Sequence, residues 1–267
     1  MTLITRRNAL ITAATGSGLL LAGCTKVRFG DTLTGSAGFQ RVLAQAEAWT
    51  LSSQRFLLSG GAMAREYSVA DISPKFKANG TLYPSGEDYE DAVNEEFARW
   101  RLTIDGMVSH PLSLSVAEIR SLPARTQITR HDCVEGWSAI GQWTGVPLGL
   151  LLKTAGVLPQ AKYAVFHCAD NLEGEPEKGG MQAPGQYYES IAVVDALHPQ
   201  TLIAHSMNGK PLDVGHGAPL RLRVERQLGY KQAKYVQRIQ LTDRLSGLYG
   251  GKGGYWEDRG YEWYAGI

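Results

Sequence analysis

Cysteine is scarce in this sequence: its 267 residues include three, Cys24, Cys133 and Cys168. Three thiols cannot build the dense disulfide framework that stabilises small secreted domains. An excess of charge is absent too, because 27 Lys and Arg nearly balance 26 Asp and Glu, and no basic block occurs. We therefore expect no nucleic-acid partner.

Long apolar runs are also missing. The apolar stretch "ALITAATGSGLLLAG" near the start is too short to span a bilayer well. It follows a paired Arg6 and Arg7, and no acidic residue precedes Asp31. This pattern is typical of an export signal for the twin-arginine route, which carries folded proteins to the periplasm. An ordinary secretory signal with two incidental arginines is the alternative.

The signal closes on "LLAGC", the pattern of a bacterial lipoprotein. Cys24 would then become the lipidated first residue of the mature chain and anchor it to a membrane. Thr25, which follows, hints at outer-membrane sorting. Alternatively, Cys24 is cut away with the signal. We expect residues 1–24 to be the signal and residues 25–75 to be a tether with an N-terminal helix.

Residues 76–267 read as one α+β domain, with strands and helices in alternation. A capping box of Ser115 and Glu118 starts one helix, Gly156 ends another, and Asn208-Gly209 predicts a hairpin. Residues 73–90 are rich in turn formers and read as a long loop. The other expected elements are a helix over 39–58 and strands over 100–108, 125–133, 162–170, before Asn208 and within 219–243.

The segment "TRHDCVEGW" holds a cysteine among ionisable groups, and the residues alone leave its role open. Cys133 could be a nucleophile with His131 as its base, since the two share a face of a strand. A zinc site would need four ligands, which "HDC" and "HC" could supply with an unusual spacing. A disulfide to Cys168 is a third reading. A soft thiolate also suits a soft metal carried by a cofactor.

Three blocks resemble the sulfite oxidase family of molybdopterin enzymes: residues 133–152, 161–166 and 198–241. Within that family the sequence is most similar to exported catalytic subunits of protein-methionine-sulfoxide reductases. The resemblance implies the sulfite oxidase catalytic fold, with mixed β-sheets and peripheral helices. It also implies a molybdopterin cofactor whose molybdenum is bound by Cys133.

The resemblance places further residues at the cofactor. Gln232, Ala233 and Lys234 fall where the family receives the pterin phosphate. Without the resemblance, Lys234 and Arg221 would read as exposed strand charges, Asn79 as a turn residue and Cys168 as a small buried one. The cofactor-binding residues that it implies are Asn79, Cys168, His216, Arg221, Gln232, Ala233 and Lys234.

Several residues near Cys133 are candidates for the chemistry itself. Glu135 keeps the reductase's carboxylate two residues past the ligand and could relay protons; an ion pair with Arg130 is the equal alternative. His131 and Asp132 are not in the reductase pattern and would tune the pocket. The Gly- and Tyr-rich tail is expected to line the substrate funnel, with Tyr249 or Tyr255 at the active site.

The resemblance favours reduction of an S-oxide such as methionine sulfoxide. Ala78 stands where sulfite-oxidising members carry an arginine, and sulfite is a dianion that arginines bind. A sulfite dehydrogenase is the first alternative, a cofactor-free binding lipoprotein the second and a cysteine hydrolase the third. The sequence has no C-x-x-C-H haem motif. We therefore expect a monomeric catalytic subunit that receives electrons from a membrane cytochrome b-type subunit.

Overall fold

The computed structural model describes residues 61–173 and 184–267, together with three isolated positions, 45, 49 and 52. The predicted signal, Cys24 and nearly all of the predicted helix over 39–58 lie outside the described residues. From residue 61 on, the described residues belong to one compact unit. In this part of the chain no helix is both long and apolar enough to cross a membrane.

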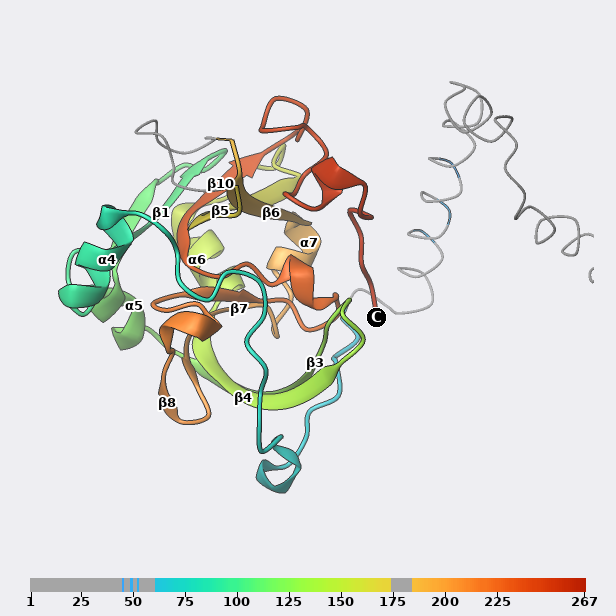
Figure 1. Cartoon of the computed structure of the whole chain (residues 1–267). Coiled ribbons are helices and arrows are strands. Elements are labelled where there is room, and N and C mark those ends of the chain that lie inside the picture. Colours follow the sequence, from blue (N-terminus) through green and yellow to red (C-terminus); the bar gives the residue numbers. More distant parts are fainter. Residues whose placement is uncertain (1–44, 46–48, 50–51, 53–60, 174–183) are drawn as a thin grey trace, which may run out of the picture. The chain divides into compact units, whose positions relative to one another are not determined.

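The described residues form two β-sheets (Figure 1). The first has the order β2 (Leu112–Ser115), β1 (Arg101–Gly106), β10 (Val236–Thr242), β5 (Tyr163–Asn171) and β6 (Gln186–Ala192). It is mixed, because β1 and β10 run parallel while the other neighbours run antiparallel. The second sheet is antiparallel and has the order β3 (Arg125–Asp132), β4 (Ser138–Pro147), β7 (Leu202–Met207) and β8 (Lys210–Pro211), with β9 (Arg221–Arg223) paired to β7.

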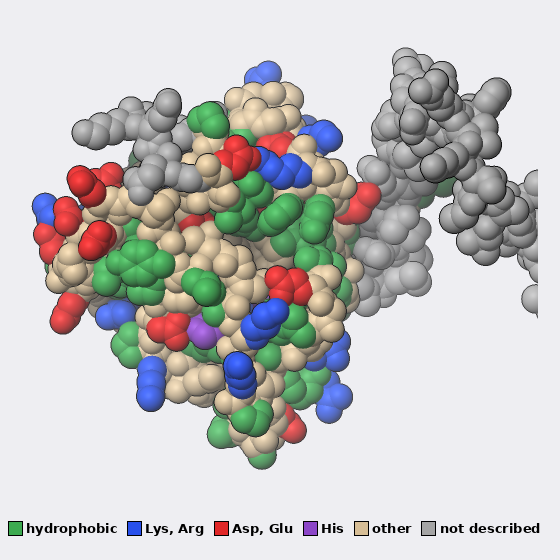
Figure 2. Space-filling model, in the orientation of Figure 1, with side chains coloured by type: hydrophobic (Ala, Val, Ile, Leu, Met, Phe, Trp, Pro, Cys, Tyr) green, Lys and Arg blue, Asp and Glu red, His purple; other side chains and the backbone are tan. Residues whose placement is uncertain are grey.

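The helices that the described residues form are short. They are α4 (Glu87–Asn94), α5 (Val116–Ser121), α6 (Leu148–Ala155) and α7 (Val193–Ala196). Of the α4 side chains only Tyr89 is buried, and Figure 2 shows acidic side chains gathered over this helix. Four 3₁₀ turns complete the fold: Val69–Asp71, Val214–His216, Gly229–Lys231 and Glu257–Arg259.

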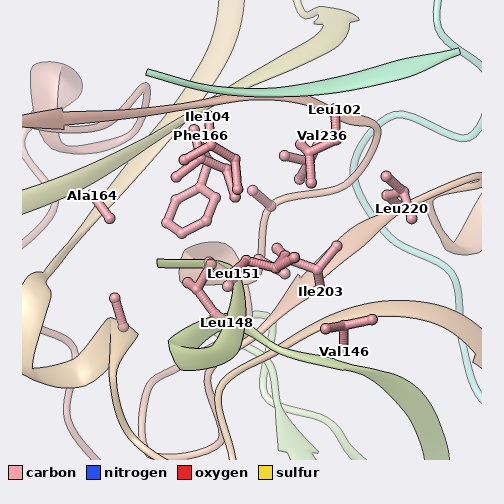
Figure 3. Close-up of a cluster of buried hydrophobic side chains, with 14 of the residues drawn as sticks. Leu102, Ile104, Val146, Leu148, Leu151, Ala164, Phe166, Ile203, Leu220 and Val236 are labelled. Atoms are coloured by element: carbon pink, nitrogen blue, oxygen red, sulfur yellow. The ribbon is translucent and has the colours of Figure 1, made fainter. Parts of the chain in front are cut away.

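The main core lies between the two sheets and includes α6 (Figure 3). Leu148, Leu151 and Leu152 of α6 are buried against strands of both sheets. Each such leucine stabilises the fold by roughly 1.5–3 kcal/mol relative to an exposed one. The expected α+β class with mixed sheets is confirmed, although α6 is a core helix rather than a peripheral one.

Local signals in the sequence were reliable. The capping box of Ser115 and Glu118 is present at α5. Gly156 ends α6 with a φ of 68°, in the left-handed region that favours glycine. Asn208 and Gly209 join β7 to β8 as the predicted hairpin.

Four elements went unpredicted: β2, β4, β6 and α4. The strand β4 contains Gly141 and Gly145, which weaken a strand pattern. Gly145 is required because a Cβ there would lie 2.3 Å from the carbonyl oxygen of Ile203 on β7. The helix α4 begins at Glu87, inside the segment that was expected to be a loop.

Candidate active site

A cavity of about 220 Å³ lies beside Cys133. Parts of the chain that are far apart in the sequence line it: residues 79–81 and 133–135, the end of β5 with Leu172, the segment that holds Gly229, Tyr230, Gln232 and Lys234, Tyr187 of β6, Arg221 of β9 and the C-terminal tail. Six of the predicted site residues line it: Asn79, Cys133, Glu135, Arg221, Gln232 and Lys234. A larger hollow of about 570 Å³ beside α4 contains none of them.

Cys133 is the first residue of the turn that joins β3 to β4. Its N–H donates to the carbonyl of Trp137 at 3.0 Å, and its own carbonyl accepts from Gly136 at 3.0 Å. The thiol is 7% exposed, and Nδ2 of Asn79 donates to Sγ at 3.3 Å. Burial raises the pKa of the Cys133 thiol. A thiolate at this position therefore needs a positive partner such as a metal ion.

Lys234 fixes the loop that carries Asn79. Its Nζ donates to the carbonyl oxygens of Asn79 at 2.8 Å and Gly215 at 3.0 Å, and to that of Thr81. Burial, followed by repulsion from Arg221, lowers the pKa of Lys234 to about 7. An anion in the cavity would act in the opposite direction and stabilise the ammonium form.

Arg221 lies buried at the start of β9. It donates through Nη1 to the carbonyl of His216 at 2.9 Å and through Nη2 to that of Gln232 at 3.4 Å. Burial and the nearby Arg223 lower the pKa of Arg221 to about 9. Among the described residues, the buried Nε of Arg221 has no acceptor. A buried cationic donor without a partner on a cavity wall indicates that a ligand supplies the acceptor.

The other three predicted cofactor residues do not line the cavity. Cys168 is 1% exposed on β5, within the main core, and burial raises the pKa of its thiol. The His216 ring bonds to Asp213 at 2.8 Å, and only its carbonyl reaches Arg221. The carbonyl of Ala233 accepts from the N–H of Leu222 at 2.7 Å. These residues lie behind the cavity wall.

Glu135 pairs with Lys77, so the alternative pair with Arg130 is wrong. Nζ of Lys77 lies 2.7 Å from Oε2 of Glu135, and Nε1 of Trp137 donates to the same oxygen at 2.9 Å. These two hydrogen bonds lower the pKa of Glu135. Arg130 pairs with Asp132 instead. Because Glu135 is ionised at neutral pH, it can accept a proton but holds none to donate.

His131 is buried behind Gly229, which lines the cavity. Nδ1 accepts from Nη1 of Arg223 at 3.1 Å, since arginine can only donate. Burial and Arg223 hold the pKa of His131 well below its usual range, so the ring is neutral. Gly229 packs directly on this ring, because a Cβ there would lie 2.5 Å from Nε2. This contact is how His131 can tune the pocket.

The other readings of Cys133 find no support in the structure. Within the part of the chain that it describes, no group of three or more His, Cys, Asp or Glu could hold a metal ion. The zinc set that combined residues 131–133 with 167–168 is therefore wrong. Cys133 and Cys168 are both free thiols. His131 is neutral, buried and engaged with Arg223, which makes it a poor base for a hydrolase.

The aromatic part of the cavity wall comes partly from the C-terminal tail. Trp256 and Tyr261 of the tail line the cavity, together with Tyr187 and Tyr230. The two expected tyrosines do not line it. The hydroxyl of Tyr249 bonds to Nδ1 of His167 at 2.8 Å, and that of Tyr255 donates to Glu173 at 3.4 Å. The aromatic density of the tail thus indicated a wall but not its members.

Residues 90–249 match a known family, described as the oxidoreductase molybdopterin binding domain. The chain belongs to this family. As a member it is a molybdopterin-dependent oxidoreductase, in agreement with the resemblance carried by the blocks around Cys133.

Individual relatives extend the match. The chain is 35% identical over 262 residues to a protein of Azospira oryzae named as a protein-methionine-sulfoxide reductase subunit, YedZ1, across 98% of this chain and 87% of that protein. It is 34% identical over 169 residues to the protein-methionine-sulfoxide reductase catalytic subunit MsrP of Xanthomonas campestris, across 61% of this chain and 52% of that protein. The chain thus spans about half the length of the second relative. A structure of the sulfane dehydrogenase SoxCD from Paracoccus pantotrophus matches 55% of this chain and 39% of its own, with 24% identity and a TM-score of 0.47.

The residues around the cavity fit a molybdopterin. A soft thiol, Cys133, suits the metal. Arg221 has a donor with no acceptor among the described residues, and Lys234 carries a cation that burial disfavours. A phosphate-bearing ligand would satisfy both, because phosphate accepts charge-assisted hydrogen bonds from arginine and lysine.

Proposed function

We propose that this oxidoreductase reduces an S-oxide such as methionine sulfoxide at a molybdenum centre ligated by Cys133. The observation that carries the proposal is the buried Cys133 thiol on the same cavity as two cations, the buried Arg221 and the partly buried Lys234. The names of the two relatives, both of protein-methionine-sulfoxide reductases, support the choice of substrate.

Some side chains of the cavity would bind the cofactor, and others would shape its surroundings. When bound, a molybdopterin would supply the two-electron oxygen-atom-transfer chemistry that the reduction of an S-oxide needs. Arg221 and Lys234 would hold its phosphate end, while the Asn79 amide donates to Sγ of Cys133 and orients the thiolate. The complete reaction consumes two electrons and two protons, and it releases the thioether and water.

The charges near Cys133 favour an S-oxide over sulfite. Ala78 stands where the sulfite-oxidising branch carries an arginine, according to the resemblance. Lys77 is already paired with Glu135. A doubly charged anion would therefore meet the Glu135 carboxylate, while Arg221, the arginine of the described cavity wall, is the one that we assign to the cofactor.

The first prediction concerns the purified protein. We expect about one molybdenum and one pterin per chain. With a reduced dye as the electron source, we expect turnover of methionine sulfoxide. With an oxidised dye as the electron acceptor, we expect far slower oxidation of sulfite. Metal analysis and a thioether assay provide the measurements. Loaded enzyme that oxidises sulfite faster than it reduces S-oxides would establish the sulfite dehydrogenase instead; protein without molybdenum and pterin would leave the cofactor-free binding lipoprotein.

We further propose export through Arg6 and Arg7, attachment through a lipidated Cys24, and electrons from a membrane cytochrome b-type subunit. The words "subunit" and "catalytic subunit" in the relatives' names support a partner. The second prediction is that Arg6→Lys with Arg7→Lys leaves the protein in the cytoplasm, because the route reads the arginine pair. Cell fractionation followed by immunoblotting measures this, with Lys26→Arg as the control. Unchanged export of the double variant would indicate the ordinary secretory route.

A further inference from the structure

We propose that Trp256, Tyr261 and Tyr230 form the wall that binds the alkyl groups of the S-oxide and sets its selectivity. This inference rests on the proposed function and assigns residues to its substrate. All three side chains line the cavity that contains Cys133.

The three rings form one continuous surface. The ring centroids of Tyr230 and Tyr261 are 5.2 Å apart at 90°, and those of Trp256 and Tyr261 are 5.3 Å apart at 30°. Tyr261 remains 42% exposed, whereas Tyr230 is 9% exposed. The wall therefore runs from the protein surface down into the cavity, on the path that a substrate would take.

An aromatic wall recognises what distinguishes an S-alkyl oxide from sulfite. Ring faces attract thioether sulfur and polarised methyl groups. They also exclude water from the alkyl chain, which favours binding of apolar groups. Sulfite has no alkyl group and gains neither contact.

The cations of the cavity cannot compensate for sulfite. Arg221 donates to two backbone carbonyls and Lys234 to three. Arg221 is buried and Lys234 is partly buried. The three donors of the Lys234 ammonium are already taken by carbonyls, and the cofactor phosphate would accept from the remaining donors of Arg221. The Glu135 carboxylate, beside Cys133, repels an anion. We therefore assign the selection of an S-oxide over sulfite to the aromatic wall.

A buried ion cluster holds the wall in place. Lys231, next to Tyr230, bonds to Glu257, next to Trp256, and to Glu189 at 2.5 Å. The side chains of all three ionic residues are 0–1% exposed. The hydroxyl of Tyr230 also donates to the carbonyl of Glu262 in the tail at 2.7 Å. Because these bonds join the 3₁₀ turn Gly229–Lys231 to the tail, the wall is formed before the substrate arrives.

The experiment compares leucine and phenylalanine variants of the wall in the cofactor-loaded enzyme. For Trp256→Leu and Tyr261→Leu we expect KM for a methyl alkyl sulfoxide to rise roughly 10- to 100-fold. We expect kcat within about threefold of wild type, since neither ring touches the metal ligand. Tyr261→Phe should keep KM at the wild-type value, because the ring face rather than the hydroxyl contacts the alkyl group. Tyr83→Leu, an exposed tyrosine off the cavity, is the control.

A binding measurement separates this inference from the proposed reaction. The dissociation constant of methyl phenyl sulfide, a product-type thioether, should rise in the leucine variants in parallel with KM. Unchanged KM and unchanged thioether binding in both leucine variants would overturn the wall. If the leucine variants misfold, the double variant Trp256→Phe with Tyr261→Phe replaces them. It should bind the sulfide as tightly as the wild type does. A large loss of sulfide affinity in this double variant would also overturn the aromatic wall. Wild-type enzyme that binds the sulfide but reduces no S-oxide would refute the proposed function and leave the wall standing.

Discussion

A Cys133→Ala variant is expected to fold normally and to lose S-oxide reduction by on the order of 10³-fold or more. Among the described residues the thiol is the one soft ligand on the cavity wall, and its removal would take away the proposed ligand of the metal. The change itself is small, because Cys133 lies in a turn and its thiol accepts hydrogen bonds only from Asn79 and the backbone of Glu135 among the described residues. Turnover, molybdenum content and thermal unfolding of the purified variant measure the three parts of this prediction.

The second buried cysteine provides a matched control. Cys168→Ala removes a thiol of the same size from β5, but this thiol lies in the core and not on the cavity wall. We expect it to lower stability by about 1 kcal/mol and to keep most of the activity. Full activity of Cys133→Ala, or loss of activity only in Cys168→Ala, would refute the ligand assignment.

The elements that the sequence predicted correctly were those with local signals. The capping box at Ser115 and the left-handed Gly156 act within one turn of chain, so they can be read from neighbouring residues. The strand β4 could not be read in this way. Its Gly145 is required by the backbone of β7, which lies almost 60 residues further along. Such a requirement exists only after the sheet has formed.

In the candidate site too, some features could be predicted from the sequence and others required the fold. The resemblance led to Cys133, Asn79, Arg221, Gln232 and Lys234, all of which the fold brings to one cavity. It could not show that Lys77 rather than Arg130 pairs with Glu135, since Lys77 is 58 residues away in the sequence.

The aromatic wall could not be predicted from the sequence either, because contacts between distant residues form it. Its tail residues are placed by the buried contact of Lys231 with Glu257. No periodicity in the Gly-rich tail marks Trp256 or Tyr261 apart from Tyr249 and Tyr255, so the choice among them required the fold.

Lys234→Met is expected to lower the cofactor content of purified protein about 10- to 100-fold. The variant removes the positive charge beside the proposed phosphate, an interaction that contributes roughly 1.5–3 kcal/mol, and it also releases the loop that carries Asn79. Pterin and molybdenum per chain are the measurements. Lys210→Met, at an exposed lysine on β8, makes the same change in net charge and should load normally. Normal loading of both variants would contradict the placing of the phosphate at Lys234.

The pKa of Lys234 adds a pH dependence with a definite sign. In the cofactor-free protein it is about 7, against an ordinary value of 10.5. Between these values the unfolded chain binds more protons than the folded one. The free energy of unfolding of cofactor-free protein should therefore rise from pH 7 toward pH 10, and Lys234→Met should lack this rise. Urea unfolding at several pH values measures both.

A bound anion should stabilise the charged form of Lys234 and so oppose this rise of the free energy of unfolding with pH. Sulfate is a suitable probe, because its charge is constant between pH 6 and pH 9. Sulfate should raise the melting temperature of cofactor-free protein more at pH 6, where Lys234 is charged, than at pH 9. The buried Asp170 lies within the influence of the same lysine, and burial raises the pKa of this carboxyl to about 6. Equal stabilisation by sulfate at both pH values would mean that Asp170 keeps Lys234 charged from pH 6 to pH 9. Arg221 would then be the cation that remains available to bind the cofactor phosphate.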